Sequence, residues 1–177
     1  MEFQTLIGSR RSVRKYADRE VTREQVEEII RAAQEAPSWK NQQTSKYYCV
    51  LSKDKREELR TTCFPSFNEQ RCMNAALIVT AYEKNNVGFD DNGQAINELG
   101  NGWGCYDLGL QNMLFMLKAK ELGLDTLVMG IRDGEKLRTA LNIPENEEIG
   151  AVLALGYADE EPKKPRRREF SDIAKIF

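Results

Sequence analysis

The sequence predicts one domain in which a β-sheet packs against helices. Three observations support this. The chain has 177 residues, close to the roughly 150 typical of one domain, and 41% of them are hydrophobic, enough for a core. The 26 Lys and Arg nearly balance the 28 Asp and Glu, which argues against a general nucleic-acid binder. Stretches typical of strands alternate with stretches typical of helices. Taken alone, this alternation favours a parallel α/β sheet.

In the first half of the chain, the clearest element is a helix that begins after Thr22. Thr22 and Gln25 fit a capping box, apolar residues follow at helical spacing, and Pro37 is expected to stop the helix. A polar loop over 37–46 comes next. The other elements expected here are a short helix over 2–9, a strand over 47–51, a mostly exposed helix over 53–62 and a buried strand over 75–82.

The second half opens with a polar stretch, 83–102, that is rich in Asn, Asp and Gly. At about 20 residues it exceeds the usual loop length, so a functional segment such as a lid is expected. The stretch 104–122 is apolar on nearly all sides, which is typical of a helix buried centrally or in a subunit interface. Gly123 ends this helix. The elements expected after it are a strand over 124–131, a helix over 133–141, a strand over 149–157 and a tail over 158–177.

Histidine is absent from the chain, and this absence excludes several classes of enzyme. Ser-His-Asp and Cys-His hydrolases lack their base, and His-ligated zinc, iron or haem sites lack their ligand. The four cysteines form no C-x-x-C pair, so we expect reduced thiols, no metal and a cytoplasmic location. The N-terminus carries no apolar signal segment, and the longest apolar stretch, 149–158, is too short to cross a membrane.

Positive charge gathers near both ends of the chain. Two such clusters can converge on one phosphate, because the guanidinium fork binds two oxygens at once, and a hydroxyl from Ser12 can join them. The alternatives are two solvated patches, or a polybasic tail that contacts RNA or anionic lipid. The cations concerned are Arg10, Arg11, Arg14 and Lys15 at one end, and Lys163, Lys164, Arg166, Arg167 and Arg168 at the other.

Two further stretches have a composition suited to ligand binding. The loop 36–43 holds Asn and Gln amides that match the edge of a flavin or nucleobase, although an ordinary polar connection would look the same. The strand end at Met129 and Gly130 can bring backbone amides close to a ligand, or it can simply be a turn. The run 100–104 is not a dinucleotide motif, because no strand precedes it and Cys105 replaces the third glycine.

Taken together, four motifs resemble those of the FMN-dependent nitroreductase family, and they occur in the family's order over nearly the whole chain. Each motif is weak by itself, but four in sequence are specific. They are Arg10-Arg11-Ser12-Val13-Arg14-Lys15-Tyr16, Ala36-Pro37-Ser38-x-x-Asn41-x-Gln43, the helix with Asp107-x-Gly109-x-Gln111-Asn112 followed by Glu121-Leu122-Gly123, and Ala154-Leu155-Gly156-Tyr157 with Pro165-Arg166-Arg167-Arg168.

The resemblance implies a role for particular residues around FMN. It implies that the cofactor phosphate and ribityl chain are held by Arg10, Arg11, Ser12 and Arg14, with Arg166 and Arg168 closing on the same phosphate. Pro37 and Ser38 would reach the flavin bound mainly by the other subunit. Asn41 would touch its ring or ribityl chain. The backbone at Met129 and Gly130 would face the flavin near N5.

The resemblance also implies a fold and an activity. The expected fold is α+β, with a mixed, mostly antiparallel sheet flanked by helices, in place of the parallel sheet that alternation alone favours. The expected protein is a single domain over 1–177 and an intertwined homodimer, whose extension 158–177 wraps the partner. The implied activity is NAD(P)H-dependent reduction of nitro, quinone or similar electron-poor acceptors by ping-pong hydride transfer. The alternative is a non-catalytic FMN-binding or sensor protein of the same fold.

Overall fold

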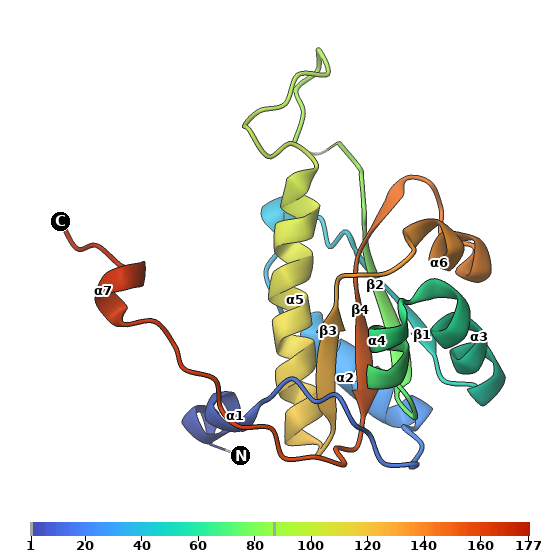
Figure 1. Ribbon diagram of the computed structural model, residues 1–177. Helices are drawn as coiled ribbons and strands as arrows, with labels where there is room; N and C mark the ends of the chain where they lie inside the picture. The colour runs from blue at the N-terminus through green and yellow to red at the C-terminus, as the bar shows by residue number, and fades with distance from the viewer. Residues whose placement is uncertain (1, 87) are drawn as a thin grey trace.

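The computed structural model describes residues 2–86 and 88–177, so Met1 and Val87 (the latter within the expected loop 83–102) lie outside the described residues. One four-stranded sheet has helices on both faces (Figure 1). The strands are β1 (Ser45–Val50), β2 (Ala76–Glu83), β3 (Asp125–Met129) and β4 (Glu147–Gly156). The helices are α1 (Phe3–Ser9), α2 (Arg23–Ala33), the short 3-10 helix η1 (Trp39–Asn41), α3 (Lys53–Cys63), α4 (Ser66–Arg71), α5 (Gly102–Glu121), α6 (Gly134–Leu141) and α7 (Phe170–Ile173).

The strand order is β1-β2-β4-β3, and all three strand pairings are antiparallel. The parallel sheet favoured by the alternation of elements is therefore wrong, because alternation does not fix the direction in which a strand runs. The α+β fold that the resemblance implied is confirmed. A parallel pairing occurs at an isolated β-bridge between Ser12 and Thr126, outside the pairings of the named strands.

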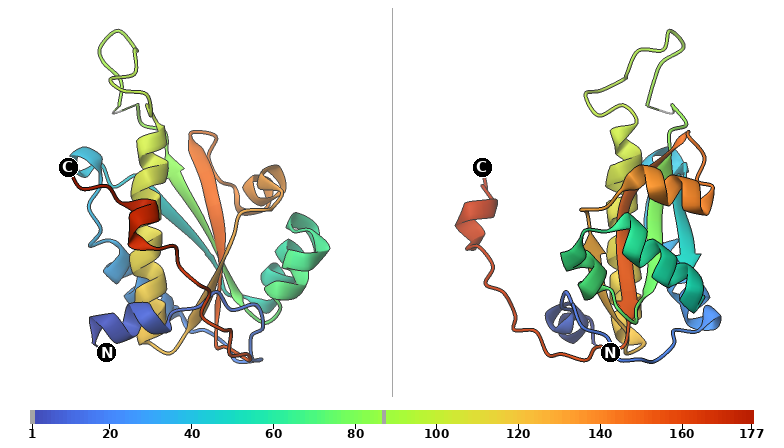
Figure 2. Two further views of the ribbon diagram at one scale, coloured as in Figure 1. Left: turned by 60° about the vertical axis from the view of Figure 1, so that its left-hand side comes forward. Right: turned by 45° about the vertical axis from the view of Figure 1, so that its right-hand side comes forward.

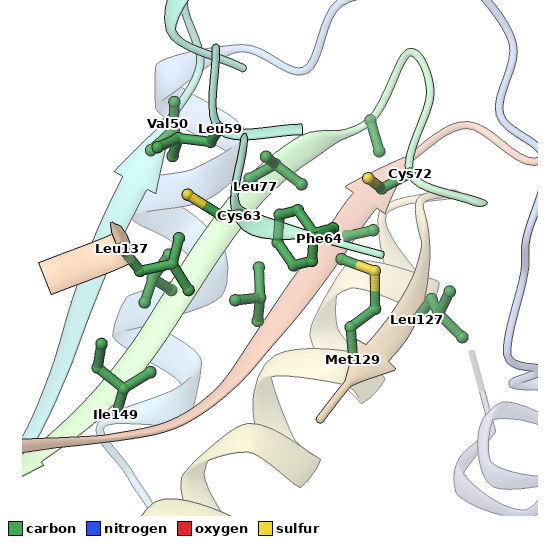
Figure 3. Close-up of a cluster of buried hydrophobic side chains, with 14 of the residues drawn as sticks. Val50, Leu59, Cys63, Phe64, Cys72, Leu77, Leu127, Met129, Leu137 and Ile149 are labelled. Carbon is green, nitrogen blue, oxygen red and sulfur yellow. The ribbon is translucent and has the colours of Figure 1, made fainter. Parts of the chain in front are cut away.

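Two hydrophobic layers sandwich the sheet, because successive strand side chains point to opposite faces. Leu77 and Val79 of β2 face α3 and α6, where they join Leu59 and Leu137 in one cluster (Figure 3). The other face packs on α2 and α5. The cluster on that face includes Val26, Ile29, Ala33, Ile78, Phe115, Ala119, Leu153 and Leu155.

Local sequence accounts for how α2 begins but not for where it ends. The capping box is formed, with the Thr22 hydroxyl accepting from the Gln25 backbone and the Gln25 side chain accepting from the Thr22 backbone. The helix ends at Ala33, so Pro37 does not stop it, contrary to the expectation. Three short helices, η1, α4 and α7, were not expected. β1 begins at Ser45 inside the expected loop, and β4 begins at Glu147, two residues early.

Helix α5 runs along the sheet and presents one side outward. Phe115 is fully buried under the sheet, whereas Tyr106 is 57% and Met113 38% exposed. The tail after β4 leaves the body of the protein, and α7 stands apart from it (Figures 1 and 2). The large apolar side chains of this tail are exposed: Phe170, Ile173, Ile176 and Phe177. No helix among the described residues is long and apolar enough to cross a bilayer.

Candidate functional site

The cationic segment 10–16 lies along the outer edge of β3. Ser12 forms a parallel bridge with Thr126, and the Val13 N–H donates to the Thr126 carbonyl at 3.1 Å. Val13 is buried beneath the segment. Because β3 is the last strand of the sheet, its outer backbone groups are available for this pairing. The sheet itself therefore fixes the position of the first motif.

The beginning of the tail holds the same segment from the other side. The Ala17 N–H donates to the Tyr157 carbonyl, and the Asp159 N–H donates to the Lys15 carbonyl, both at 2.9 Å. The Lys15 ammonium lies 2.6 Å from the Asp159 carboxylate, and the hydrogen bond from this carboxylate raises the pKa of Lys15. The Glu160 carboxylate accepts from the Arg14 backbone N–H. The first and last motifs of the sequence are thus joined through their backbones.

Tyr16 anchors this junction in the core. Its hydroxyl donates to the Val13 carbonyl at 2.9 Å, and burial raises its pKa well above the usual range. A Cβ at Gly156 would come within 2.8 Å of the Tyr16 ring, so the glycine is needed for close packing here. This requirement explains why the last motif carries Gly directly before Tyr157.

The guanidinium groups of Arg11 and Arg14 donate hydrogen bonds to backbone carbonyls. Arg11 Nη1 donates to the carbonyls of Gly8 and Arg10, at 2.7 and 2.8 Å, and Arg14 Nη1 donates to the Ser12 carbonyl at 3.0 Å. Within 2–86 and 88–177, no ion pair to a carboxylate is recorded for these guanidinium groups. Arg11 Nε and Thr126 Oγ1 are buried with no hydrogen-bond partner in the described structure. The segment therefore offers uncompensated positive charge and polar groups suited to an anionic or hydroxyl-bearing ligand.

The edge of β3 leads from Thr126 to the predicted strand end. The outer backbone groups of Thr126 face segment 12–13, so the alternation of a strand directs the Val128 and Gly130 groups to the same edge. The Met129 side chain, in contrast, is buried in the core (Figure 3). By the same alternation the Met129 backbone groups point toward β4, so at this edge Gly130 presents backbone groups to a ligand, and the role predicted for Met129 stays a prediction. Beyond it, Arg132 donates to the Gly130 carbonyl at 3.0 Å.

The second motif forms a loop near the N-terminal end of α5, and hydrogen bonds within the loop help to hold its shape. The Ser38 hydroxyl accepts from the Gln43 backbone at 3.0 Å, and the Asn41 side chain accepts from the Gln43 amide at 3.3 Å. The Trp39 N–H donates to the Asp107 carboxylate at 2.8 Å, which ties the loop to the second turn of α5. Pro37 and Asn41 are exposed.

One protomer does not bring all the predicted residues together. The loop 37–43 contacts α5 at Asp107, whereas segment 10–16 meets the chain just after α5 ends. These two points on the helix are about 15 residues apart, which corresponds to about 22 Å along the helix axis. Arg166 and Arg168 are exposed on the outgoing tail, and Arg166 bonds to Glu169 at 3.2 Å. Within the described residues, these two arginines form no hydrogen bond or ion pair with segment 10–14.

Sequence reasoning missed several residues that shape this edge. Thr126 is a buried polar residue within an apolar strand, a signal that was available in the sequence. Asp159 and Glu160 hold the arginine segment, but their partners lie about 145 residues away, so no local pattern indicates the pairing. The contact between Asp107 and Trp39 likewise joins residues 68 positions apart.

Comparison with known proteins identifies the family and the fold of this chain. The model of the nitroreductase family matches residues 7–157, from the first motif to the last glycine and tyrosine. The chain belongs to the nitroreductase family. It is therefore expected to share the family's fold, and the solved structures bear this out. A protein from Exiguobacterium sibiricum, solved in complex with FMN, superposes with a TM-score of 0.82 at 20% identity, covering 100% of this chain and 98% of that one.

Two curated relatives of this nitroreductase family member are similar over most of its length. A protein of Archaeoglobus fulgidus, provisionally named NADH dehydrogenase/NAD(P)H nitroreductase, is 28% identical over 164 residues, covering 90% of this chain and 87% of the relative. The FMN reductase [NAD(P)H] of Bacillus subtilis is 27% identical over 164 residues, covering 88% of this chain and 66% of the relative.

Proposed function

We propose that this nitroreductase family member is an FMN-dependent NAD(P)H oxidoreductase that reduces nitro compounds, quinones or similar electron-poor acceptors. Its family, the names of its relatives and the FMN-bound structural neighbour support this function. The observation that carries it is the β3 edge, where unpaired arginines flank buried donors at Arg11 and Thr126. This edge suits a phosphate at one end and a flat polar ring at the other.

Segment 10–14 would hold the phosphate. The ribityl chain would then follow the β3 edge from Ser12 and Thr126 toward Gly130. Thr126 and Gly130 are four residues apart, which is about 13 Å along a strand. Arg11 Nε and Thr126 Oγ1 are buried without partners, and both fit the oxygens of such a ligand. The residues present therefore fit FMN.

The chemistry in this proposal needs no side-chain nucleophile, since bound FMN supplies the hydride-accepting and hydride-donating centre. The protein's part is to position and to stabilise charge. The Gly130 backbone amide would donate a hydrogen bond to the ring, and the guanidinium groups would balance the phosphate. One open face would receive the nicotinamide and then the acceptor in turn, which gives ping-pong kinetics.

A second copy of the chain would complete the site. The loop with Pro37, Ser38 and Asn41 lies far along α5 from segment 10–14, so it would serve the flavin of the other subunit. The exposed side of α5, with Tyr106 and Met113, would form the interface together with Phe3 and Ile7 of α1. Arg166 and Arg168 would close on the phosphate from the tail.

The tail 158–177 would wrap the partner. Phe170, Ile173, Ile176 and Phe177 are between 66% and fully exposed, a costly arrangement for an isolated chain. A groove of about 500 Å³ runs between α2 and the free edge of β1. Its apolar lining includes Val26, Ile30, Val50 and Leu51, and Arg23, Glu27 and Lys55 lie along it as well. This groove would receive the tail of the second copy.

The first experiment is the visible absorbance spectrum of the purified protein, with identification of any chromophore released by heat. The proposal predicts FMN, and steady NAD(P)H oxidation with a quinone or nitroaromatic acceptor, with parallel double-reciprocal lines. Bound FMN without turnover would instead favour the non-catalytic binding protein. A colourless protein that takes up no added FMN would refute both.

Two variants test the phosphate site. Arg10→Ala and Arg11→Ala are expected to weaken FMN binding about tenfold or more, the scale of a lost charge-assisted hydrogen bond. Arg31→Ala is the matched control, because Arg31 forms an exposed ion pair with Glu27 on α2. Equal FMN affinity in all three variants would remove segment 10–14 from the site.

The dimer is tested separately by light scattering. A chain shortened to residue 169 loses all four exposed apolar residues of the tail, so its dimer should dissociate at higher concentrations than that of the full chain. A full-length protein that is monomeric at micromolar concentration would refute the shared site.

A further inference from the structure

A buried carboxylate of α5 holds the loop of the second motif. Asp107 is only 4% exposed, and its Oδ2 accepts from the Trp39 backbone N–H at 2.8 Å. Burial raises the pKa of the Asp107 carboxyl, and the hydrogen bond from the Trp39 N–H lowers it by a smaller amount. Burial of a carboxylate with one backbone donor costs stability, so packing alone does not explain an aspartate here.

The loop that Asp107 holds has a strained backbone. Lys40, Asn41 and Gln43 adopt φ values of 50°, 54° and 49°, in the left-handed region that side chains disfavour. Each such residue costs roughly 1 kcal/mol or more, so external contacts must maintain the loop. Ser38 and Asn41, the residues predicted to reach the flavin, lie in this same stretch.

A second set of contacts joins this loop to the segment 84–101. The Trp39 and Trp103 rings lie 5.1 Å apart, and the Trp103 indole N–H donates to the Asn97 side chain at 2.9 Å. The Asn85 amide donates to Gln42 at 3.0 Å. Gly88 packs so closely on the Trp39 indole that an added Cβ would lie 2.7 Å from it. The two segments thus share one aromatic contact surface at the start of α5.

We propose that Asp107 is a positioning residue, which holds the loop 37–43 in the conformation that presents Ser38 and Asn41 to the cofactor. We further propose that the Trp39 indole, packed on Gly88 and on Trp103, couples this loop to segment 84–101. The statement about the cofactor rests on the proposed function. The statement about the loop does not, because its contacts lie within one chain. An acceptor that binds beside segment 84–101 would therefore alter the conformation of the cofactor-binding loop 37–43.

The chain offers two direct readouts of this unit in the protein without flavin. Its two tryptophans are Trp39 and Trp103, so tryptophan emission excited at about 295 nm reports on the surroundings of this pair. Lys40 is exposed within the loop, so cleavage by trypsin after Lys40, identified by mass spectrometry, measures how often the loop opens. Neither readout requires turnover.

The test compares Asp107→Leu with Gln111→Leu. Gln111 is the matched control because it is also buried on α5, one turn later, but it contacts Tyr47 instead of the loop. Asp107→Leu should raise cleavage after Lys40 about tenfold and shift the tryptophan emission, while Gln111→Leu changes cleavage less than twofold. Wild-type cleavage and emission in a folded Asp107→Leu variant would overturn the proposal.

Two further variants decide the matter if Asp107→Leu does not fold. Asp107→Asn keeps an acceptor oxygen but loses its charge, so it should be intermediate in cleavage, between the wild type and a fully released loop. Trp103→Leu leaves Asp107 intact and removes the contacts of Trp103 with Trp39 and Asn97, which weakens the link to segment 84–101, so cleavage after Lys40 should again rise. Wild-type cleavage in both would overturn the proposal.

FMN affinity separates this proposal from the proposed function. Asp107→Leu should weaken FMN binding about tenfold, with Asp107→Asn closer to the wild type. If no variant and no wild-type protein binds FMN, the proposed function fails, but the cleavage and fluorescence results still decide whether Asp107 holds the loop. If FMN binds equally to all variants while cleavage rises, the loop is held by Asp107 but does not contact the cofactor, and the positioning role is refuted.

Discussion

Segment 10–17 and loop 37–43 carry the predicted cofactor contacts from opposite ends of α5, and different forces hold them. Backbone hydrogen bonds to Thr126, Tyr157 and Asp159 fix the segment, so it behaves as an added edge of the sheet. The loop is fixed by the Asp107 carboxylate and by aromatic contact with Trp103. Changes near the segment should therefore cost global stability, whereas changes near the loop should alter local order with little loss of stability.

The largest effect is expected where α5 meets β3, at the base of the segment. Lys120 lies 2.9 Å from the Asp125 carboxylate, which is only 6% exposed. Lys120→Met leaves that carboxylate buried without its partner, so unfolding free energy should fall by about 3 kcal/mol. Lys118→Met, two residues earlier, removes pairs whose carboxylates, on Glu28 and Glu121, are solvent-exposed, and should cost less than about 1 kcal/mol. Chemical denaturation of both variants gives the comparison, and equal losses would contradict it.

The next largest effect should come from Gly156→Ala. The new methyl group would lie 2.8 Å from the buried Tyr16 ring, and overpacking of this kind costs about 1–3 kcal/mol. Gly8→Ala in α1 is the control, because nothing lies within 4 Å of the added Cβ and alanine favours a helix. Thermal melts that rank Gly8→Ala below Gly156→Ala would show that Tyr16 does not anchor the segment.

The two regions also differ in how far the sequence predicted them. The capping box at Thr22 and Gln25, the apolar strand that became β2 and the Gly156–Tyr157 motif are local patterns, and each appears where expected. Strand direction was wrong because it depends on how β4 inserts between β2 and β3, which no local pattern encodes.

The candidate site shows the same limit. The arginines of segment 10–14 were recognisable from charge and motif, but their neighbour Thr126 and their anchor Asp159 come from distant parts of the chain. The loop residues Ser38 and Asn41 were recognisable too. The contact that holds them, from Asp107 to a backbone N–H, involves no side-chain pattern at Trp39 and so leaves no trace in the sequence.

A smaller effect is expected from Gly88→Ala, which tests the loop side. Its Cβ would meet the Trp39 indole at 2.7 Å and the Gly100 carbonyl at 2.8 Å. Gly88 and Gly100 are buried, but most of residues 90–99 between them are exposed, so this local segment can relax around the methyl group. We therefore expect a stability loss of about 1 kcal/mol, at the low end for overpacking, with a clear change in tryptophan emission. Gly102→Ala is the control, because its Cβ meets Leu99 at an ordinary 3.7 Å. A loss as large as that of Gly156→Ala would remove the contrast between the two regions.

The smallest effect is a pH dependence at Asp107. Because burial raises its pKa in the folded state, the folded protein takes up this proton at higher pH than the unfolded chain does. Wild-type stability should therefore rise relative to Asp107→Asn as pH falls through the window between the raised pKa and the usual aspartate value. The same protonation weakens the bond to the Trp39 N–H, so the tryptophan emission should shift toward that of the released loop over that window. Denaturation and tryptophan emission across pH 7 to 4 measure both. If stability rises while the loop becomes less ordered, the ionised carboxylate holds the loop and lowers the stability of the whole fold. If stability and loop order change in the same direction, Asp107 is an ordinary structural residue.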